Sequence, residues 1–277
     1  MGACTHGTTG WLLQERTGTA AEGGLAGEAG EPPSVGGEND AGAAGIAGDG
    51  GAGAAEPAPR CPSRFTTQCS PTIIYDNRDK AGSGALFDQA IPDIATTLPC
   101  ITRDVCDILY RKSDEIRTIT QITVLIENFD GVSETYGANG ESTIHLSSKY
   151  MQQVVDSDGD LASELRGIFY YQDTNIYQFD GGDGTANSWI VEGVANFVRH
   201  TGGFLPLSQR MVGGKYDDGG TTTGFFLVWL DQQYPDFVYE LNQSLNPATT
   251  TMWSSQSFMD ITGKSADDSW TAYQKSL

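Results

Sequence analysis

Two runs of apolar residues at helical spacing, separated by a glycine-rich stretch, constrain the fold of this chain more than any other feature. The first run holds Leu161, Leu165, Ile168, Phe169 and Ile176, and the second holds Ile190, Val191, Val194, Phe197 and Val198. Apolar residues three and four apart fall on one side of a helix. Asp160 is predicted to cap the first helix, and Gly202-Gly203 to end the second. The sequence therefore predicts two buried helices that face each other across the short turn 180–184.

Each predicted helix carries two polar residues one turn apart. Tyr171 and Asn175 share a face of the first helix, and Glu192 and Asn196 share a face of the second. The same spacing occurs in an H-E-x-x-H zinc site, where two histidines bind the metal, the glutamate between them is the general base, and a later helix gives a third ligand. Here Tyr171 and Asn175 stand at the histidine positions, and Gln172 stands at the glutamate position.

The residues around these positions carry a family resemblance. Residues 167–178 read GIFYYQDTNIYQ, and residues 192–199 read EGVANFVR. They resemble G-[IV]-L-Y-H-E-x-T-H-x-x-Q and E-G-[IL]-A-D-Y-V-R of the basic secretory protein family, secreted proteins of plants and microbes regarded as zinc metallopeptidases. Further similar segments lie at 124–132, 143–150, 221–227, 237–242 and 262–273, so that the resemblance covers about residues 72–277. It implies an α+β fold of the zincin-like metallopeptidase type, with a small mixed sheet packed by helices.

The resemblance also assigns the altered positions. It implies that Tyr171 and Asn175 replace the ligand histidines, Gln172 the catalytic glutamate and Asn196 an aspartate, while Glu192 remains as the third ligand or its support. Zinc takes imidazole, thiolate or carboxylate, whereas amides are poor donors and a phenol ordinarily loses its proton only near pH 10. Gln172 cannot act as a general base. We therefore expect a pseudoenzyme that has lost its zinc and whose former cleft binds a peptide or a polysaccharide.

Two alternatives stay open from the sequence. An active zinc peptidase with unconventional ligands would use Glu192, Asp173 and His200, although Asp173 points to a different face of its helix than Tyr171. A purely structural surface protein would not use the former site at all.

The first 60 residues are predicted to be a disordered tether, and residues 61–277 to be the folded domain. From about residue 20 to residue 60 the chain is mostly Gly, Ala, Glu and Pro, which buries too little apolar surface to fold. Met1-Gly2-Ala3-Cys4 resembles the end of a bacterial lipoprotein signal, so Cys4 is a candidate lipid anchor, with an ordinary free thiol as the alternative. No segment is apolar enough over its length to span a membrane. We expect an extracytoplasmic protein, either secreted or a cell-surface lipoprotein.

The number of cysteines and the net charge restrict the cellular compartment and the possible partners of the protein. Cys61, Cys69, Cys100 and Cys106 form an even set that is compatible with two disulfides in an oxidising compartment, with four buried thiols as the alternative. The 16 basic and 36 acidic residues give a net charge of −20, which argues against nucleic acid or an anionic membrane as partner. The domain itself is acidic, despite the family name. We expect a monomer.

The remaining elements follow from local pattern. Strands are expected at 72–75, at 118–126 in the centre of the sheet, and at 143–148, whose edge is a candidate peptide-binding site or an ordinary sheet edge. The stretch 86–110 is expected to be mainly helical and to be broken or kinked at Pro92 and Pro99. Helices are also expected at 225–231 and 237–245, and the segment 258–273 is expected to close the domain.

Three aspartates and two histidines are weighed as ligands and set aside. Asp156, Asp158 and Asp160 are closely spaced, but their glycine is misplaced for a calcium loop, so a turn and a helix cap are favoured. His145 is expected to be a hydrogen-bonded structural residue. His200 is expected to lie at the C-terminal end of its helix, where a cation suits the helix dipole.

Overall fold

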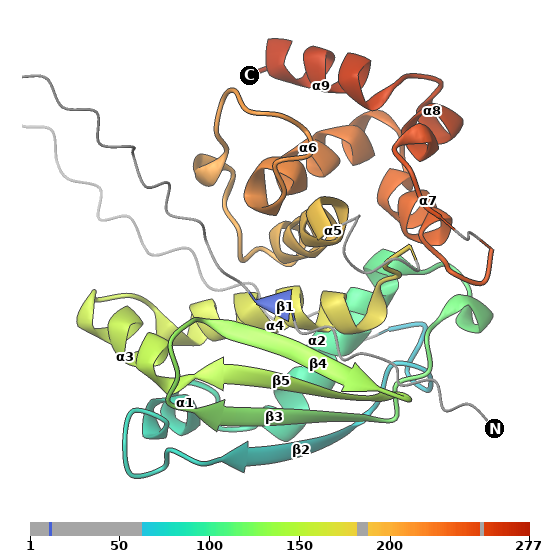
Figure 1. Ribbon diagram of the computed structural model, residues 1–277. Coiled ribbons are helices and arrows are strands. Elements are labelled where there is room, and N and C mark those ends of the chain that lie inside the picture. The colour runs from blue at the N-terminus through green and yellow to red at the C-terminus, as the bar shows by residue number, and fades with distance from the viewer. Residues whose placement is uncertain (1–10, 13–62, 182–187, 250–251) are drawn as a thin grey trace, which may run out of the picture. The chain divides into compact units, whose positions relative to one another are not determined.

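The computed structural model describes residues 11–12, 63–181, 188–249 and 252–277 (Figure 1). The strands are β1 (Trp11–Leu12), β2 (Thr72–Asn77), β3 (Gln121–Glu127), β4 (Ser133–Ala138) and β5 (Glu141–Ser147). The α-helices are α1 (Ala85–Ala90), α2 (Ile94–Leu109), α3 (Ser148–Asp156), α4 (Leu161–Tyr177), α5 (Ser188–Thr201), α6 (Gly220–Gln233), α7 (Phe237–Ser244), α8 (Gln256–Thr262) and α9 (Ala266–Lys275). Short 3-10 helices lie at Ser113–Glu115 and Leu207–Gln209.

The five strands form one mixed sheet in the order β1-β4-β5-β3-β2. β2, β3 and β5 run parallel, whereas β4 is antiparallel to both β5 and β1. Ile122, Val124 and Ile126 alternate along β3 and are fully buried, as expected for a strand in the middle of a sheet with a covered face. The predicted α+β class and the central position of the strand near 118–126 are confirmed.

The strand predicted at 143–148 is present as β5, but the prediction that its edge receives a peptide was wrong. β5 lies between β3 and β4, with His145 opposite Leu125 on one side and Glu134 on the other. The reason is the two-residue turn between β4 and β5. Asn139 and Gly140 both have positive φ, 56° and 82°, which suits the tight hairpin turn that folds β4 back along β5.

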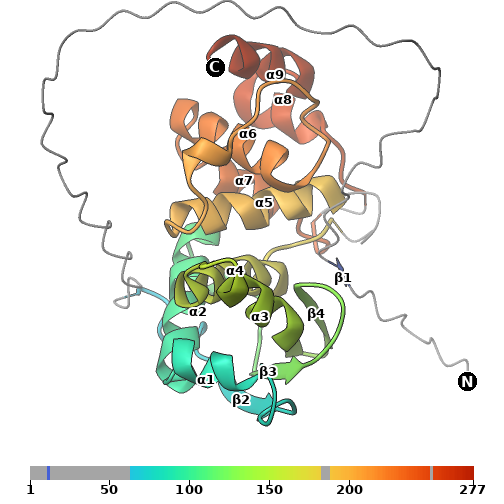
Figure 2. The same cartoon turned by 90° about the vertical axis from the view of Figure 1, so that its left-hand side faces the viewer.

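The helices are stacked in layers on one face of the sheet (Figures 1 and 2). α2 and α4 lie next to the strands, and Phe87 of α1 packs edge-on against Phe169 of α4 with ring centroids 6.2 Å apart. α5 packs on α4, and α6 packs on α5. The helices predicted at 225–231 and 237–245 are α6 and α7, and the closing segment 258–273 contains most of α8 and α9. α4 is therefore buried between the sheet and α5.

Only one of the two prolines expected to break the 86–110 stretch separates helices. Pro92 lies between α1 and α2, and Asp93 then caps α2 by accepting a hydrogen bond from the amide of Thr96 at 3.1 Å. Pro99 lies inside α2, which continues to Leu109. Leu98 and Ile101 on either side of it are fully buried, and this packing holds the helix together through the lost backbone hydrogen bond.

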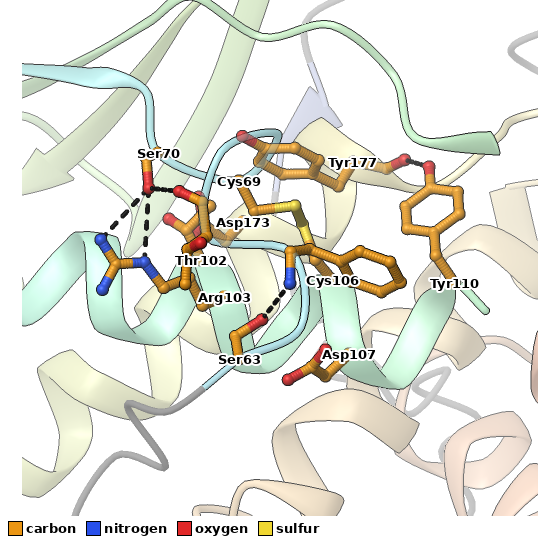
Figure 3. The surroundings of a disulfide bond; sticks show 12 residues. Ser63, Cys69, Ser70, Thr102, Arg103, Cys106, Asp107, Tyr110, Asp173 and Tyr177 are labelled. Carbon is orange, nitrogen blue, oxygen red and sulfur yellow. Dashed lines mark hydrogen bonds between the residues drawn. A yellow bond between two sulfur atoms is a disulfide. The ribbon is translucent and has the colours of Figure 1, made fainter. Parts of the chain in front are cut away.

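A disulfide joins the segment before β2 to α2. Cys69 and Cys106 are bonded and both are fully buried (Figure 3). Cys100 is disulfide-bonded as well, to a cysteine outside the described residues. The expected disulfide chemistry is thus present in the folded part, and the alternative of four buried thiols is wrong.

The predicted tether 1–60 includes one element that the composition did not indicate. Trp11 and Leu12 form β1 at the edge of the sheet, so the tether prediction was wrong for these two residues. The rest of the stretch, including Cys4, lies outside the described residues, as does Cys61. None of the helices in the described ranges combines the length and apolar character needed to cross a bilayer.

Candidate functional site

The helix α4 carries most of the predicted site and is fixed at both ends. Asp160 caps it by accepting a hydrogen bond from the amide of Ser163 at 3.2 Å, as predicted. Residues 167–174 are all buried, because the helix has the sheet on one side, α2 on another and α5 on the third. Polar side chains in such a helix must find partners within the protein. Those partners define what the site can do.

Gln172, which the motif resemblance aligns with the catalytic glutamate, is 2% exposed. Its amide nitrogen donates to Ser133 Oγ at 2.7 Å, and its amide oxygen accepts from the hydroxyl of Thr135 and, at 3.3 Å, from the amide of Asn175. Turning the amide round would place its NH₂ against the NH₂ of Asn175, so the network fixes its orientation. Gln172 thus joins α4 to β4 rather than facing a substrate with a free group.

The network continues from Asn175 towards α5. Gln178 donates from its amide nitrogen to Asn175 Oδ1 at 2.8 Å and to the backbone oxygen of Val191 at 3.1 Å. Asn175, which the motif resemblance aligns with the second ligand histidine, therefore accepts from one amide and donates to another. A chain of hydrogen bonds runs from β4 through α4 to α5.

Tyr171, which the motif resemblance aligns with the first ligand histidine, is 6% exposed. Burial raises the pKa of its phenol well above the ordinary value, and the negative charge of Glu192 raises this pKa further, against the effect of a hydrogen bond with Asn175. The structure thus brings Tyr171 and Asn175 together, as the helix spacing predicted, with Glu192 close enough to act on the phenol. The phenol is therefore protonated at neutral pH.

Glu192 and Asn196 lie on α5 and make contacts that serve the next helix. Glu192 Oε2 accepts a hydrogen bond from the backbone amide of Gly220, 3.1 Å away, at the first residue of α6. A carboxylate at a helix N-terminus is stabilised by the unpaired amides and the helix dipole. Asn196 donates to the backbone oxygen of Glu192 at 3.0 Å, one turn earlier on its own helix.

The approach of α5 to α6 depends on two glycines. A Cβ at Gly193 would lie 2.3 Å from the methyl carbon of Thr223, and a Cβ at Gly224 would lie 2.6 Å from the Cβ of Asn196. Each glycine therefore faces a side chain of the opposite helix at a distance that no larger residue allows. This close crossing sets the position of Glu192 and Asn196.

These side chains do not fit a zinc ion. The oxygens of Gln172 and Asn175 already accept hydrogen bonds, Tyr171 keeps its proton, and one oxygen of Glu192 is used by α6. Zinc needs three or four imidazole, thiolate or carboxylate ligands, and Glu192 is the only such group among the five motif side chains. In the part of the chain that the structure describes, no three His, Cys, Asp or Glu side chains form a group that could hold a metal.

The alternative ligand set of Glu192, Asp173 and His200 is not brought together. Asp173 points to α2, where it accepts a hydrogen bond from Thr102 at 2.5 Å beside the Cys69–Cys106 disulfide (Figure 3). His200 lies in the last turn of α5, as predicted, with Nδ1 2.6 Å from the backbone oxygen of Leu205. The hypothesis of an active peptidase with these three ligands is therefore wrong.

Asp173 is nevertheless an unusual residue. It is fully buried, and its second carboxylate oxygen has no hydrogen-bond partner among the described residues. Burial raises the pKa of Asp173 to about 7, against a hydrogen bond from Thr102 that lowers it. The adjacent Tyr177 hydroxyl is buried as well. Asp173 is therefore neutral in the folded protein over much of the acidic range.

The other residues weighed as ligands have structural roles. Asp156 ends α3, Asp158 adopts a positive φ of 58°, and Asp160 caps α4, so this cluster is a turn followed by a cap, as predicted. His145 is hydrogen-bonded, also as predicted. Its Nδ1 lies 2.9 Å from Glu134 and its Nε2 lies 3.0 Å from Glu127, on opposite sides of the ring.

Sequence reasoning missed the partners that complete the site. Ser133, Thr135 and Gly220 contact the motif positions directly but lie on other elements, and Gln178 ends the quoted motif without having been given a role. Asn139-Gly140 was a usable signal, because Asn-Gly between two extended runs favours a tight hairpin. That signal would have placed β4, and with it Ser133 and Thr135, beside β5.

Comparison with known proteins identifies one relationship. A family model described as a peptidase of plants and bacteria matches residues 70–273. No curated protein and no solved structure matches the chain.

Proposed function

The chain belongs to the basic secretory protein family, peptidases of plants and bacteria, and from this premise we propose that it is a catalytically inactive member that binds an extended peptide beside its former zinc site. In this proposal zinc is lost and the protein acts by binding. The zincin-like version of the fold and an extracytoplasmic location, secreted or held at the cell surface through Cys4, belong to the same proposal. The two disulfide-bonded regions at Cys69 and Cys100 support the location.

The observation that carries the proposal is the hydrogen bonding of Gln172. Its nitrogen donates to Ser133 and its oxygen accepts from Thr135 and Asn175. A general base must have a lone pair of suitable basicity directed at the attacking water. Gln172 has no such basicity, and its acceptor oxygen is used within the protein. The side chains of Tyr171, Gln172 and Asn175, which replace the family's three site residues in this proposal, thus form one connected polar network.

A peptide is favoured over a polysaccharide by the position of β4. On the side that faces away from β5, this strand pairs with the two residues of β1, and its Ser133 and Thr135 hold Gln172. An extended peptide can pair with the backbone of such a strand, which provides affinity without any catalytic group. A polysaccharide lacks the regularly spaced amides that this pairing requires. The ligand is therefore expected next to the former catalytic residue.

Zinc titration of the purified full chain by calorimetry, with elemental analysis, tests the loss of the metal. We expect no stoichiometric zinc, and no cleavage of a denatured protein substrate that a chelator abolishes. The matched control is the variant Glu192→Gln, which removes the remaining carboxylate. Stoichiometric zinc that is lost in Glu192→Gln, together with chelator-sensitive cleavage, would overturn the proposal.

A further inference from the structure

The side of β4 that faces away from β5 is paired with another segment of the same chain. β1 pairs antiparallel with β4, with Trp11 opposite Thr135 and Leu12 opposite Glu134. Both views show β1 along the side of β4 that faces away from β5 (Figures 1 and 2). The pairing thus falls on the part of β4 that holds Gln172, since Thr135 is also the residue that donates to the amide oxygen of Gln172.

We propose that Trp11 and Leu12 form a built-in competitor that must leave the edge of β4 before an external extended peptide can bind there. This inference rests on the proposed peptide-binding function. Main-chain pairing at a strand edge admits one strand at a time, because each backbone amide and carbonyl of the edge has one set of partners. A docked β1 therefore excludes any other peptide from the same residues of β4.

The sequence of the first 60 residues points to the same segment. Trp11, Leu12 and Leu13 are the only three consecutive large apolar residues between residues 1 and 60. An isolated run of this kind in a Gly- and Ala-rich stretch is the part with the strongest tendency to pair as a strand. Residues 13–62 connect β1 to the rest of the described chain, so pairing is intramolecular.

The strength of this contact is expected to be modest. A two-residue strand makes few backbone hydrogen bonds, and each is only weakly stabilising because it replaces a hydrogen bond with water. Its covalent connection raises its local concentration to the order of millimolar, and this concentration falls as the connection lengthens. An external peptide with more paired residues can therefore displace it. β1 would lower the affinity for an external peptide without preventing its binding.

Backbone hydrogen exchange of the full chain, followed by mass spectrometry, tests whether β1 protects β4. The variant Trp11→Pro/Leu12→Pro removes both amide hydrogens of β1. We expect exchange within 133–138 to become at least twofold faster than in the unsubstituted chain. The matched control, Ala20→Pro/Ala21→Pro, alters the same N-terminal stretch outside β1 and should leave this exchange unchanged. β2, on the other side of the sheet, serves as an internal reference. Equal exchange in all three proteins would overturn the proposal.

Peptide binding tests the competition itself. The probe is a synthetic peptide of residues 8–15, TTGWLLQE, and the control peptide carries prolines at its Trp and Leu positions. The Trp11→Pro/Leu12→Pro chain should bind the probe more tightly than the unsubstituted chain. The ratio of the two affinities should equal the factor by which β1 slows hydrogen exchange in 133–138, because both ratios depend on the same equilibrium between docked and undocked β1. Equal binding to both chains, with faster exchange in the variant, would overturn the competition. Binding to neither chain would overturn the peptide-binding function and leave β1 as a permanent cover of the edge.

Discussion

Thr135 of β4 donates its hydroxyl hydrogen bond to the amide oxygen of Gln172 on α4. The nitrogen of the same amide donates to Ser133 Oγ at 2.7 Å. One side chain thus ties the helix to the strand through both ends of its amide. Gln172 is therefore a structural connection between two elements that are far apart in the sequence.

We expect Gln172→Ala to destabilise the protein by about 1–3 kcal/mol, because it leaves the buried Ser133, Thr135 and Asn175 groups without their partner. The measurement is the urea midpoint with an unchanged m-value. Gln153→Ala on α3 is the matched control, since Gln153 is exposed and such a change usually alters stability by less than about 0.5 kcal/mol. Equal midpoints for the two variants would contradict the structural role of Gln172.

Restoring the family ligands should restore metal binding. Tyr171, Asn175 and Glu192 are close together, so the double variant Tyr171→His/Asn175→His places two imidazoles one turn apart beside a carboxylate. We expect zinc affinity at least tenfold above that of the unsubstituted chain, measured by calorimetry.

The control for this experiment is Tyr171→His/Asn175→Ala. It makes the same change at Tyr171 and removes the amide at Asn175, but it supplies only one imidazole. Equal zinc affinity of the two double variants would show that Asn175 does not stand at a ligand position.

The sequence predicted the elements that depend on local pattern. Apolar spacing and Asp160 located α4, and the period from Ile190 to Val198 located α5, because a buried helix face repeats over short distances. The i, i+4 spacing also placed Tyr171 beside Asn175. These inferences needed no information about the rest of the chain.

The features of the fold and of the candidate site that the sequence did not predict depend on contacts between segments far apart in the sequence. The resemblance aligned Glu192 with the family's third ligand or its support, and nothing near it in the sequence indicated that its carboxylate accepts a hydrogen bond from Gly220, the first residue of α6. Pro99 remains inside a helix because its neighbours are buried in the core. The pairing of Trp11 and Leu12 with β4 joins residues more than a hundred positions apart, and composition alone favoured a tether there. No local pattern contains these contacts.

The buried carboxyl of Asp173 should make stability depend on pH. Its folded-state pKa of about 7 lies above the unfolded value of about 3.9, so the folded state binds the proton more tightly. Its ionisation therefore removes stability as the pH rises from about 4 to about 7, by about 4 kcal/mol in total at 1.36 kcal/mol per pKa unit. Below pH 4 this loss is absent, and above pH 7 it is constant.

The variant Asp173→Asn tests this assignment. The amide keeps an acceptor for Thr102 and cannot ionise, so its stability relative to the unsubstituted chain should rise between pH 4 and pH 7 and then level off. The measurement is the difference in urea midpoints across this range. Gln153→Ala, at an exposed position and without an ionisable group, should give a difference that does not vary with pH. Parallel curves for Asp173→Asn would show that the carboxyl is not buried as described.

The disulfide between Cys69 and Cys106 should provide a large share of the domain's stability. The two residues are 37 positions apart, and closing a loop of this length in the unfolded chain corresponds to about 4 kcal/mol. We expect Cys69→Ala/Cys106→Ala to lower the free energy of unfolding by this order, measured under oxidising conditions. An unchanged free energy of unfolding in the double variant would contradict this estimate.

The close crossing of α5 and α6 offers a test in which one change offsets another. Gly193→Ala places a Cβ 2.3 Å from the methyl carbon of Thr223 and 2.9 Å from its Cβ, and overpacking of this kind destabilises by about 1–3 kcal/mol. Thr223→Ser removes the methyl group but keeps the hydroxyl, which donates to the backbone oxygen of Tyr216 at 2.6 Å. The double variant should therefore recover part of the loss, and a double-mutant cycle on the urea midpoints measures the recovery. Strictly additive effects would mean that the two helices do not meet at these residues, and the position of Glu192 would then need another explanation.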